Sequence, residues 1–384
     1  MMGPIRLGAA VLAAAALAPM SASAATSAQA IANLNAQRAA NGIPAQITEN
    51  PSASAGCAAH DNYERMNGGM LSHSETAGNP GYTTAGDQAA GESVLAEGTD
   101  WGTANPWEAA PIHLAQLLNP YLDQLGVDDS DGFVCATTLP PDAGFRPSPA
   151  TVVGYSYPGN GQVAWPASET AAEGPFTPGD LVGLPQPMTT GPYLFVLFAG
   201  PWPVYTATVA LSSATLTGPA GPVAIKTVDG TTPTPAGIPL GDYIGGEAML
   251  IPVAALAAGR TYTAQATGAI AQGGTSQPVS ERFSFTTAIS AAALHRESRL
   301  RLSAPRHRHR SLSFRLSGTG AYVGRRARVK VRLGRRVVRG WKTKVSAKST
   351  LTVSHRRHAT VSVTVPSFTA DGVHFRTTTV TRSA

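Results

Sequence analysis

The sequence predicts a multidomain protein in which an α/β domain is followed by two all-β domains. Nearly all of the helical signal lies in residues 26–160, where apolar side chains recur at helical spacing. Residues 175–289 contain only short β-prone segments punctuated by Gly and Pro, and residues 296–384 alternate apolar with polar or basic side chains. A chain of 384 residues is longer than one hydrophobic core usually serves, which agrees with several domains.

Residues 1–24 have the composition of a signal peptide. Arg6 supplies a positive start, Leu7 to Ala18 is an apolar run, and Ala22-Ser23-Ala24 is a small-residue cleavage site. No later stretch approaches the roughly 18 consecutive apolar residues that a membrane-spanning helix needs. We therefore expect an extracellular protein, secreted or associated with the cell envelope, with no transmembrane segment.

Within residues 26–160, helix caps and stop signals predict three helices. Ser, Asn and Pro are favoured at helix starts, whereas Asn-Gly and Asn-Pro pairs end helices. The segment "GMLSHSETAGNPGYTTAGDQAAGESV", residues 69–94, is predicted to be a turn-rich loop. The helices are expected from Ser27 to Asn41, from Asn50 to Asn67 and from Pro111 to Asn119, and the strands in "FVCATTL" and "ATVVGYSY".

The chain contains two cysteines, Cys57 and Cys135, both downstream of the export signal. An even pair in an oxidising compartment is most simply a disulfide. A metal-binding pair is the weaker interpretation, because the two cysteines lack a short ligand spacing.

The second domain, residues 175–289, has the strand spacing of a β-sandwich. The stretch "LIPVAALAAGRTYTAQATG", followed by "FSFTT", resembles bacterial Ig-like modules, and this likeness implies spacing or binding rather than chemistry. The predicted strands are "PYLFVLF", "YTATVAL", "VAIKTV", "EAMLIPV", "RTYTAQATG" and "RFSFTT".

The third domain, residues 296–384, is strongly basic. Residues 291–384 hold 22 of the 29 Lys and Arg and only two acids, a net charge of +20, whereas the other 290 residues carry 7 basic and 21 acidic groups, a net −14. In "ARVKVRL", the side chains of Arg328, Lys330 and Arg332 fall on one face of a strand and the apolar ones on the other. We predict that this face binds an anionic polymer or polysaccharide of the cell envelope. A merely solvated basic face is the alternative, and nucleic acid is disfavoured by export and by the scarcity of aromatic side chains.

Several short motifs appear in a fixed order in the first domain. They are Ser72-His73, Gly91-Glu92, Trp107, Pro111 with His113, Leu117-Leu118-Asn119-Pro120, and Gly126-Val127. In this order the segment resembles the CAP superfamily, the SCP-like extracellular domain shared by cysteine-rich secretory, antigen 5 and pathogenesis-related proteins. The departures are Ser93 for the usual Asn, Leu114 for a common Arg and Asp128 for a Gly.

The resemblance implies a CAP-like α-β-α sandwich with an open cleft. By it, His73, Glu92 and His113 would converge in that cleft, and Glu108 matches the family's second glutamate. Two imidazoles with one or two carboxylates suit zinc or another divalent cation, and we give His73, Glu92 and His113 as the metal ligands. The cleft would then bind an unidentified small or lipid ligand.

Three functions follow from these observations. The favoured one is a surface protein whose cleft binds a ligand, carried on β modules with a polyanion-binding tail. A metal-assisted hydrolase of peptide or cell-wall material is the first alternative, and a structural surface protein with a non-functional cleft is the second. Enzyme activity is the less favoured interpretation, because the sequence has no Gly-x-Ser-x-Gly elbow, no His-Glu-x-x-His pair and no phosphate-binding loop.

Overall fold

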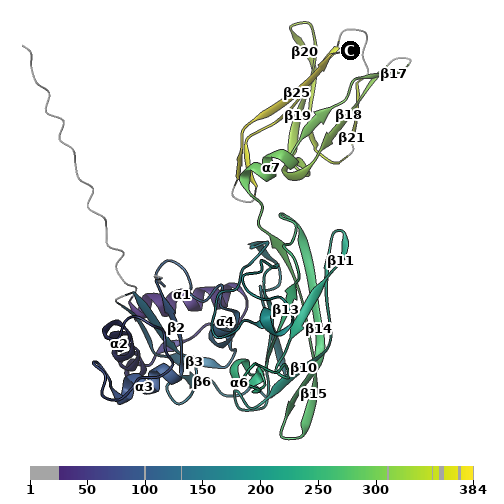
Figure 1. Cartoon of the computed structure of the whole chain (residues 1–384). Helices are drawn as coiled ribbons and strands as arrows, with labels where there is room; N and C mark the ends of the chain where they lie inside the picture. Colours follow the sequence, from purple (N-terminus) through teal and green to yellow (C-terminus); the bar gives the residue numbers. More distant parts are fainter. Residues whose placement is uncertain are drawn as a thin grey trace, which may run out of the picture. The chain divides into compact units, whose positions relative to one another are not determined.

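The computed structural model describes residues 26–98, 101–130, 132–308, 311–347, 349–353, 359–370 and 373–383 (Figure 1). The predicted signal peptide, residues 1–24, lies outside these residues. Most of the regular structure is β, arranged in several sheets, with short helices between them. Among the described helices, none combines the length and the apolar composition needed to cross a membrane. The described residues divide into two compact units, the first within 26–36, 46–107 and 122–145 and the second within 37–45, 108–121 and 146–383.

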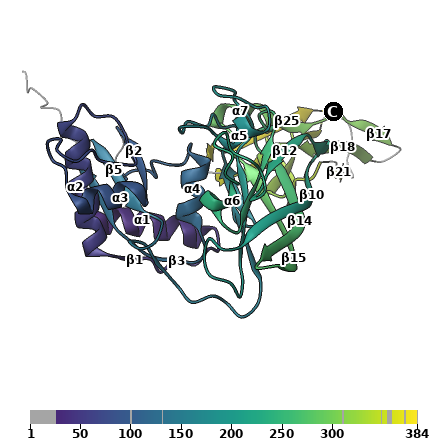
Figure 2. The same ribbon diagram turned by 60° about the horizontal axis from the view of Figure 1, so that its bottom comes forward.

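The first unit is built around helix α2, Pro51–Met66, which packs on a three-stranded antiparallel sheet. That sheet has the order β2-β5-β4, with β2 at Ser93–Glu97, β5 at Phe133–Thr137 and β4 at Val127–Ser130. Helix α3, Thr84–Gly91, packs beside α2 (Figure 2). A second small sheet joins β1 (Thr48–Glu49), β3 (Leu122–Leu125) and β6 (Gly144–Phe145).

Small residues allow these elements to approach α2 closely. A Cβ added to Gly126 would lie 2.3 Å from the backbone of Ala53 in α2, so no larger residue fits there. A Cβ on Gly56 of α2 would lie 3.1 Å from the backbone oxygen of Ala85 and from the side chain of Ala89 in α3. Tight packing of this kind stabilises α2 and α3 even where their residues have a weak intrinsic helix propensity.

Helix α3 corrects the prediction of a continuous turn-rich loop over residues 69–94. The Thr83 side chain accepts a hydrogen bond from Gly86 N at 2.8 Å and so caps the helix. Ala89 and Ala90 are fully buried, and their packing outweighs the low helix propensity of the Gly- and Thr-rich segment. The predicted first, second and third helices are present as α1 (Ser27–Ala40), α2 and α4 (Pro111–Leu118). The hydroxyl of Thr26, one residue before the predicted cap, accepts from Gln29 N.

A disulfide joins Cys57 of α2 to Cys135 of β5, as the cysteine count predicts. The two Cα atoms lie 5.3 Å apart, within the usual range for a disulfide, and both residues are fully buried. The bond spans 78 residues of sequence and ties the helical layer of the first unit to its sheet.

Two antiparallel-rich sheets form the first part of the second unit. Their strand orders are β11-β10-β14-β15-β8 and β12-β13-β9-β7. The first sheet comprises β11 (Gly221–Val223), β10 (Thr208–Gly218), β14 (Thr261–Gln272), β15 (Thr275–Thr287) and β8 (Gln162–Trp165). The second comprises β12 (Ile225–Val228), β13 (Glu247–Pro252), β9 (Leu194–Ala199) and β7 (Val153–Tyr157).

Every residue of β9 and β13 is buried, so both faces of the four-stranded sheet are covered at its centre. Helix α4 packs against α6 (Gly241–Ile244), which contacts β13 (Figure 1). A short helix, α5, spans Pro178–Leu181. Strand β7 lies in the segment predicted to end the first domain, and it pairs with β9 from Val153↔Ala199 to Tyr157↔Phe195.

The C-terminal β module follows helix α7, Ala291–Glu297, and has its own hydrophobic core. One sheet has β18 (Ser311–Gly318) between β21 (Ser349–Val353) on one side and β16 (Leu300–Leu302) and β17 (Arg306–Arg308) on the other. The other sheet has the order β20-β19-β22-β25, at Arg336–Lys344, Arg326–Leu333, Ala359–Val365 and Thr378–Ser383. A hairpin of β23 (Phe368–Ala370) and β24 (Val373–Phe375) and a short 3₁₀ turn at Gly320–Tyr322 complete it.

Buried and exposed side chains alternate regularly along the strands β18, β19 and β22. Phe314 and Leu316 of β18, together with Val329 of β19 and Val363 of β22, point into one shared core. The outer faces of the two sheets therefore point away from each other, and they carry the polar and charged side chains.

Candidate functional site

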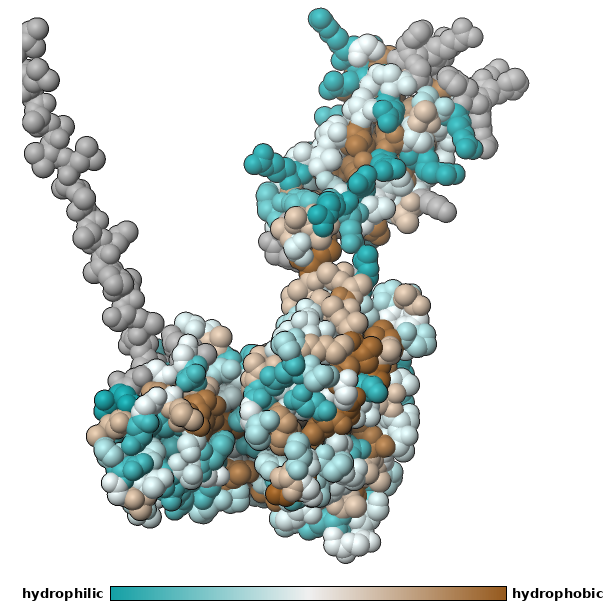
Figure 3. All heavy atoms as spheres, in the orientation of Figure 1, coloured by the Kyte–Doolittle hydropathy of each residue, from teal (hydrophilic) through white to brown (hydrophobic). Residues whose placement is uncertain are grey.

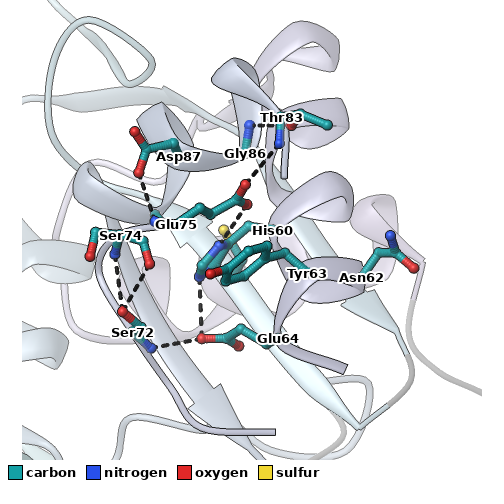
Figure 4. A network of polar contacts seen from close by, with 12 residues as sticks. His60, Asn62, Tyr63, Glu64, Ser72, Ser74, Glu75, Thr83, Gly86 and Asp87 are labelled. Atoms are coloured by element: carbon teal, nitrogen blue, oxygen red, sulfur yellow. Dashed lines mark hydrogen bonds and ion pairs between the residues drawn. The ribbon is translucent and has the colours of Figure 1, made fainter. Parts of the chain in front are cut away.

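The loop before α3 is held by a buried network centred on His60 (Figure 4). The Nδ1 atom of His60 lies 3.1 Å from Glu75 Oε1, and Nε2 lies 3.2 Å from Glu64 Oε1. All three side chains are almost completely buried. Burial alone lowers the pKa of His60, but hydrogen bonds and charge from Glu64 and Glu75 raise it above its ordinary value overall.

The two carboxylates of this network also bind the loop backbone. Glu64 accepts from Ser72 N at 2.8 Å, and Glu75 accepts from Thr83 N at 2.9 Å. The backbone N of Glu75 in turn donates to Asp87 of α3 at 2.7 Å. The network therefore connects α2, the loop and α3, and it fixes the segment that carries His73.

His73 and Glu92 both lie at the C-terminal end of α3. His73 Nδ1 donates to the carbonyl oxygen of Ala90 at 2.9 Å, which satisfies one of the carbonyl groups that a helix end leaves without a helical partner. Glu92, the residue that follows α3, accepts from Asp142 N at 2.9 Å. Partial burial raises the pKa of Glu92, against the lowering effect of that hydrogen bond.

His113 belongs to the second unit, where it lies in the first turn of α4 beside Glu173. Its Nδ1 atom is 2.8 Å from Glu173 Oε2. The same carboxylate accepts from the backbone N of Ile112 at 2.9 Å and of His113 at 3.3 Å. Glu173 thus caps α4, because Ala110 at the cap position provides no side-chain hydrogen bond. Burial raises the pKa of Glu173 despite these hydrogen bonds.

Glu108 also lies in the second unit, with its carboxylate covered by Tyr157 and Gln37. Tyr157 OH donates to Glu108 at 2.9 Å, and the Gln37 amide makes a short hydrogen bond to the same carboxylate. Burial raises the pKa of Glu108. Burial and the charges of Glu108 and Glu173 raise the pKa of Glu169 to about 8.

Two glutamates that sequence reasoning missed, Glu169 and Glu173, therefore interact with these residues. The charge of Glu108 acts on Glu169, and Glu173 contacts His113. Glu169 and Glu173 both lie more than 50 residues beyond the motifs that single out His113, in a Gly- and Pro-rich segment, so no local pattern marks them. The convergence of His73, Glu92 and His113 in one cleft stays a prediction.

The described residues give no support to His73, Glu92 and His113 as the ligands of a divalent cation. Within the described part of the chain, no group of three or more His, Cys, Asp or Glu side chains could hold a metal ion.

The basic face predicted in the third domain lies on β19. Its side chains alternate between exposed and buried, with Arg326, Arg328, Lys330 and Arg332 exposed and Ala327, Val329 and Val331 buried. Arg328 pairs across the sheet with Lys342 of β20, and Arg326 pairs with Lys344. On the other side Arg328, Lys330 and Arg332 pair with Thr364, Ser362 and Thr360 of β22. The exposed face thus has a row of cations flanked by further cations and by hydroxyl groups.

Comparison with known proteins identifies no family for this chain. No family model matches it, and no curated protein matches it. Solved structures that match include two of β-glucuronidase from Parabacteroides merdae, one of them with glycerol in the active site. These two share 7% and 8% sequence identity with this chain, cover 62% of it and 24% of the glucuronidase, and have TM-scores of 0.16 and 0.17. The chain therefore spans about a quarter of the length of those enzymes, and similarity at this level indicates neither a shared fold nor a shared activity.

Proposed function

We propose that this chain is an exported protein that binds an anionic polymer of the cell envelope through the outer face of the sheet β20-β19-β22-β25. The observation that carries the proposal is the row of exposed cations on β19, whose opposite face is buried in the core of the C-terminal module. The protruding side chains of this module are hydrophilic on the face that Figure 3 presents.

The cations on this face are close enough to act together. Alternate residues of a strand are about 7 Å apart and neighbouring strands about 5 Å, both within the Debye length of roughly 8 Å at physiological salt. The charges of Arg328, Lys330 and Arg332 therefore add to one patch with those of Lys342 and Lys344. Such a patch attracts dense polyanions through many weak contacts.

An envelope polymer is favoured over nucleic acid for two reasons. The export signal expected in residues 1–24 separates the protein from intracellular nucleic acid. In addition, base stacking needs accessible aromatic faces, yet Tyr322 is buried in the core and Trp341 has Arg339 over its ring, 5.5 Å from the ring centroid.

We further propose that residues 26–160 form a CAP-like domain with a ligand-binding role. The motif order supports this proposal, and so does the position of His73 and Glu92 at the same end of α3. We favour ligand binding without catalysis. The hydrolase alternative depends on a metal site that has no support among the described residues. Co-purification of a small or lipid molecule that His73→Ala or Glu92→Gln abolishes would support the role, and identical extracts from all three proteins would favour a structural domain with a non-functional cleft.

Cell fractionation tests the envelope proposal. In full-length protein, Arg328→Gln/Lys330→Gln/Arg332→Gln should move the protein from the envelope fraction to the medium, and a high-salt wash should release the unmodified protein. The matched control is Arg65→Gln/Lys226→Gln/Arg282→Gln, which removes three exposed positive charges elsewhere. The proposal fails if the two triple variants partition alike.

A further inference from the structure

A groove of the C-terminal module lies where β16 and β18 of one sheet meet the edge strand β25 of the other, and none of the β19 cations lines it. It has a volume of about 510 Å³, within the usual range for ligand sites, and is formed by β16, β18 and β25. Every charged side chain that lines it is an arginine, and these are Arg301, Arg315 and Arg382. A neighbouring groove of about 420 Å³ shares Ser303 and Arg315 with it and adds Arg306.

The strand register brings these arginines together. Arg301 of β16 is the cross-strand partner of Ser317 of β18, and Arg315 lies two residues before Ser317 on the same outer face. Arg301 and Arg315 are therefore diagonal neighbours, with Cα atoms roughly 7 to 8 Å apart, so their long side chains can reach one ligand group. The backbone there is fixed, because Ser303 N donates to Arg315 O at 2.9 Å and Arg315 N donates to the Ser303 hydroxyl at 2.8 Å.

Arg382 is oriented by a hydrogen bond to the protein, whereas the N–H donors of Arg301 and Arg315 are available to a ligand. Arg382 Nε donates to the carbonyl oxygen of Leu302 at 3.0 Å, which holds its guanidinium group at the groove. Among the described residues, the guanidinium groups of Arg301 and Arg315 donate to no protein acceptor, although each offers five N–H donors. Among the described residues that line this concave surface there is no carboxylate, so its arginine donors are complementary to an oxyanion.

We propose that this groove binds the phosphate groups of a phosphate-bearing polymer. The planar fork of arginine matches a phosphate with two parallel hydrogen bonds, which a lysine ammonium cannot reproduce. The run of arginines from Arg382 through Arg301 and Arg315 to Arg306 extends over two adjoining grooves, which favours a chain of phosphates over a single ion. The outer face of β19 attracts polyanions by charge alone, whereas this groove adds paired hydrogen bonds from arginine to the phosphate oxygens.

The test measures the affinity of the full-length protein for inorganic polyphosphate at one salt concentration. Arg301→Lys/Arg315→Lys keeps the charge and leaves Arg382 in place but removes the paired hydrogen bonds, so it should weaken polyphosphate binding about tenfold. The matched control, Arg65→Lys/Arg282→Lys at two exposed arginines outside the C-terminal module, should leave this affinity unchanged. Equal melting temperatures of the three proteins establish that the variants fold.

The proposal is overturned if Arg301→Lys/Arg315→Lys binds polyphosphate as tightly as the unmodified protein. That result leaves the function of the β19 face intact, because that function depends on charge and is tested by glutamine substitutions there. Conversely, a β19 face that binds nothing would not remove the affinity for polyphosphate that Arg301 and Arg315 determine.

Discussion

His60 lies between two carboxylates in the interior of the first unit, and its charge links α2 to the loop that carries His73. His60 Nδ1 hydrogen-bonds Glu75, and a protonated ring also attracts the carboxylate of Glu64, which lies 3.2 Å from Nε2. The protonated form is therefore the one that the folded structure stabilises, which is why its pKa is raised against the opposing effect of burial.

His60→Gln should therefore change the pH dependence of stability. Because the folded pKa of His60 lies above the unfolded value of 6.5, its contribution is complete below about pH 6.5 and is lost as pH rises through the folded pKa. Unfolding of the variant and of the unmodified protein, measured from pH 5 to pH 9, should give a stability difference that shrinks with rising pH. Burial raises the pKa of neighbouring Asp61 to about 10, but this effect is common to both proteins and cancels in the difference. A difference that does not vary with pH would mean that His60 is not charged in the fold.

Glu173→Ala should destabilise the second unit. The change leaves the backbone N–H groups of Ile112 and His113 without their acceptor at the start of α4, at a cost of about 1 to 3 kcal/mol in the free energy of unfolding. Glu173→Gln retains an acceptor oxygen and should recover most of this loss. Denaturant unfolding of the two variants checks the prediction, and equal destabilisation by Ala and Gln would show that the cap is unimportant.

At the scale of elements, helix α2 is joined to the sheet of the first unit by packing and by the Cys57–Cys135 disulfide. Cys57→Ala/Cys135→Ala should lower the free energy of unfolding by up to about 4 to 5 kcal/mol, the chain-entropy value for a separation of 78 residues. Non-reducing digestion of the secreted protein should also yield a peptide that contains both cysteines. Two free thiols in freshly exported protein would contradict the prediction.

The elements also show what the sequence could predict. Caps and Pro-containing boundaries predict α2 and α4 closely, because those signals are local. Helix α3 could not be predicted, since its stability depends on a close contact with α2 that becomes visible only in the fold. For the same reason His60, an unremarkable position in the sequence of α2, proves to be the centre of a network with Glu75, which lies 15 residues further along the chain.

In the candidate sites too, local features could be predicted from the sequence, whereas tertiary contacts could not. The exposed cations of β19 follow from strand alternation, which is a local property, and they are found where the sequence places them. Glu169 and Glu173 are brought to Glu108 and His113 by tertiary folding, and no motif spacing encodes that approach. The arginine groove is likewise hidden in the sequence, because Arg301 and Arg315 meet only through the pairing of β16 with β18.

At the scale of the whole molecule, charge is divided unevenly along the chain, with a net +20 in residues 291–384 against −14 in the rest. The exposed cations of this basic segment occupy a module with its own core, so they are presented to solvent on a rigid surface. This division of charge is the physical basis on which we propose that the C-terminal module holds the protein on an anionic polymer.

The most direct test is the salt dependence of binding between the purified full-length protein and an anionic cell-wall polymer. Each phosphate that a cation neutralises contributes about 0.7 to 0.9 to the slope of log affinity against log salt, so Arg328→Gln/Lys330→Gln/Arg332→Gln should reduce the magnitude of that slope by about two to three. The control variant Arg65→Gln/Lys226→Gln/Arg282→Gln should keep the slope of the unmodified protein. An unchanged slope in the β19 variant, or an equal reduction in both, would contradict the account.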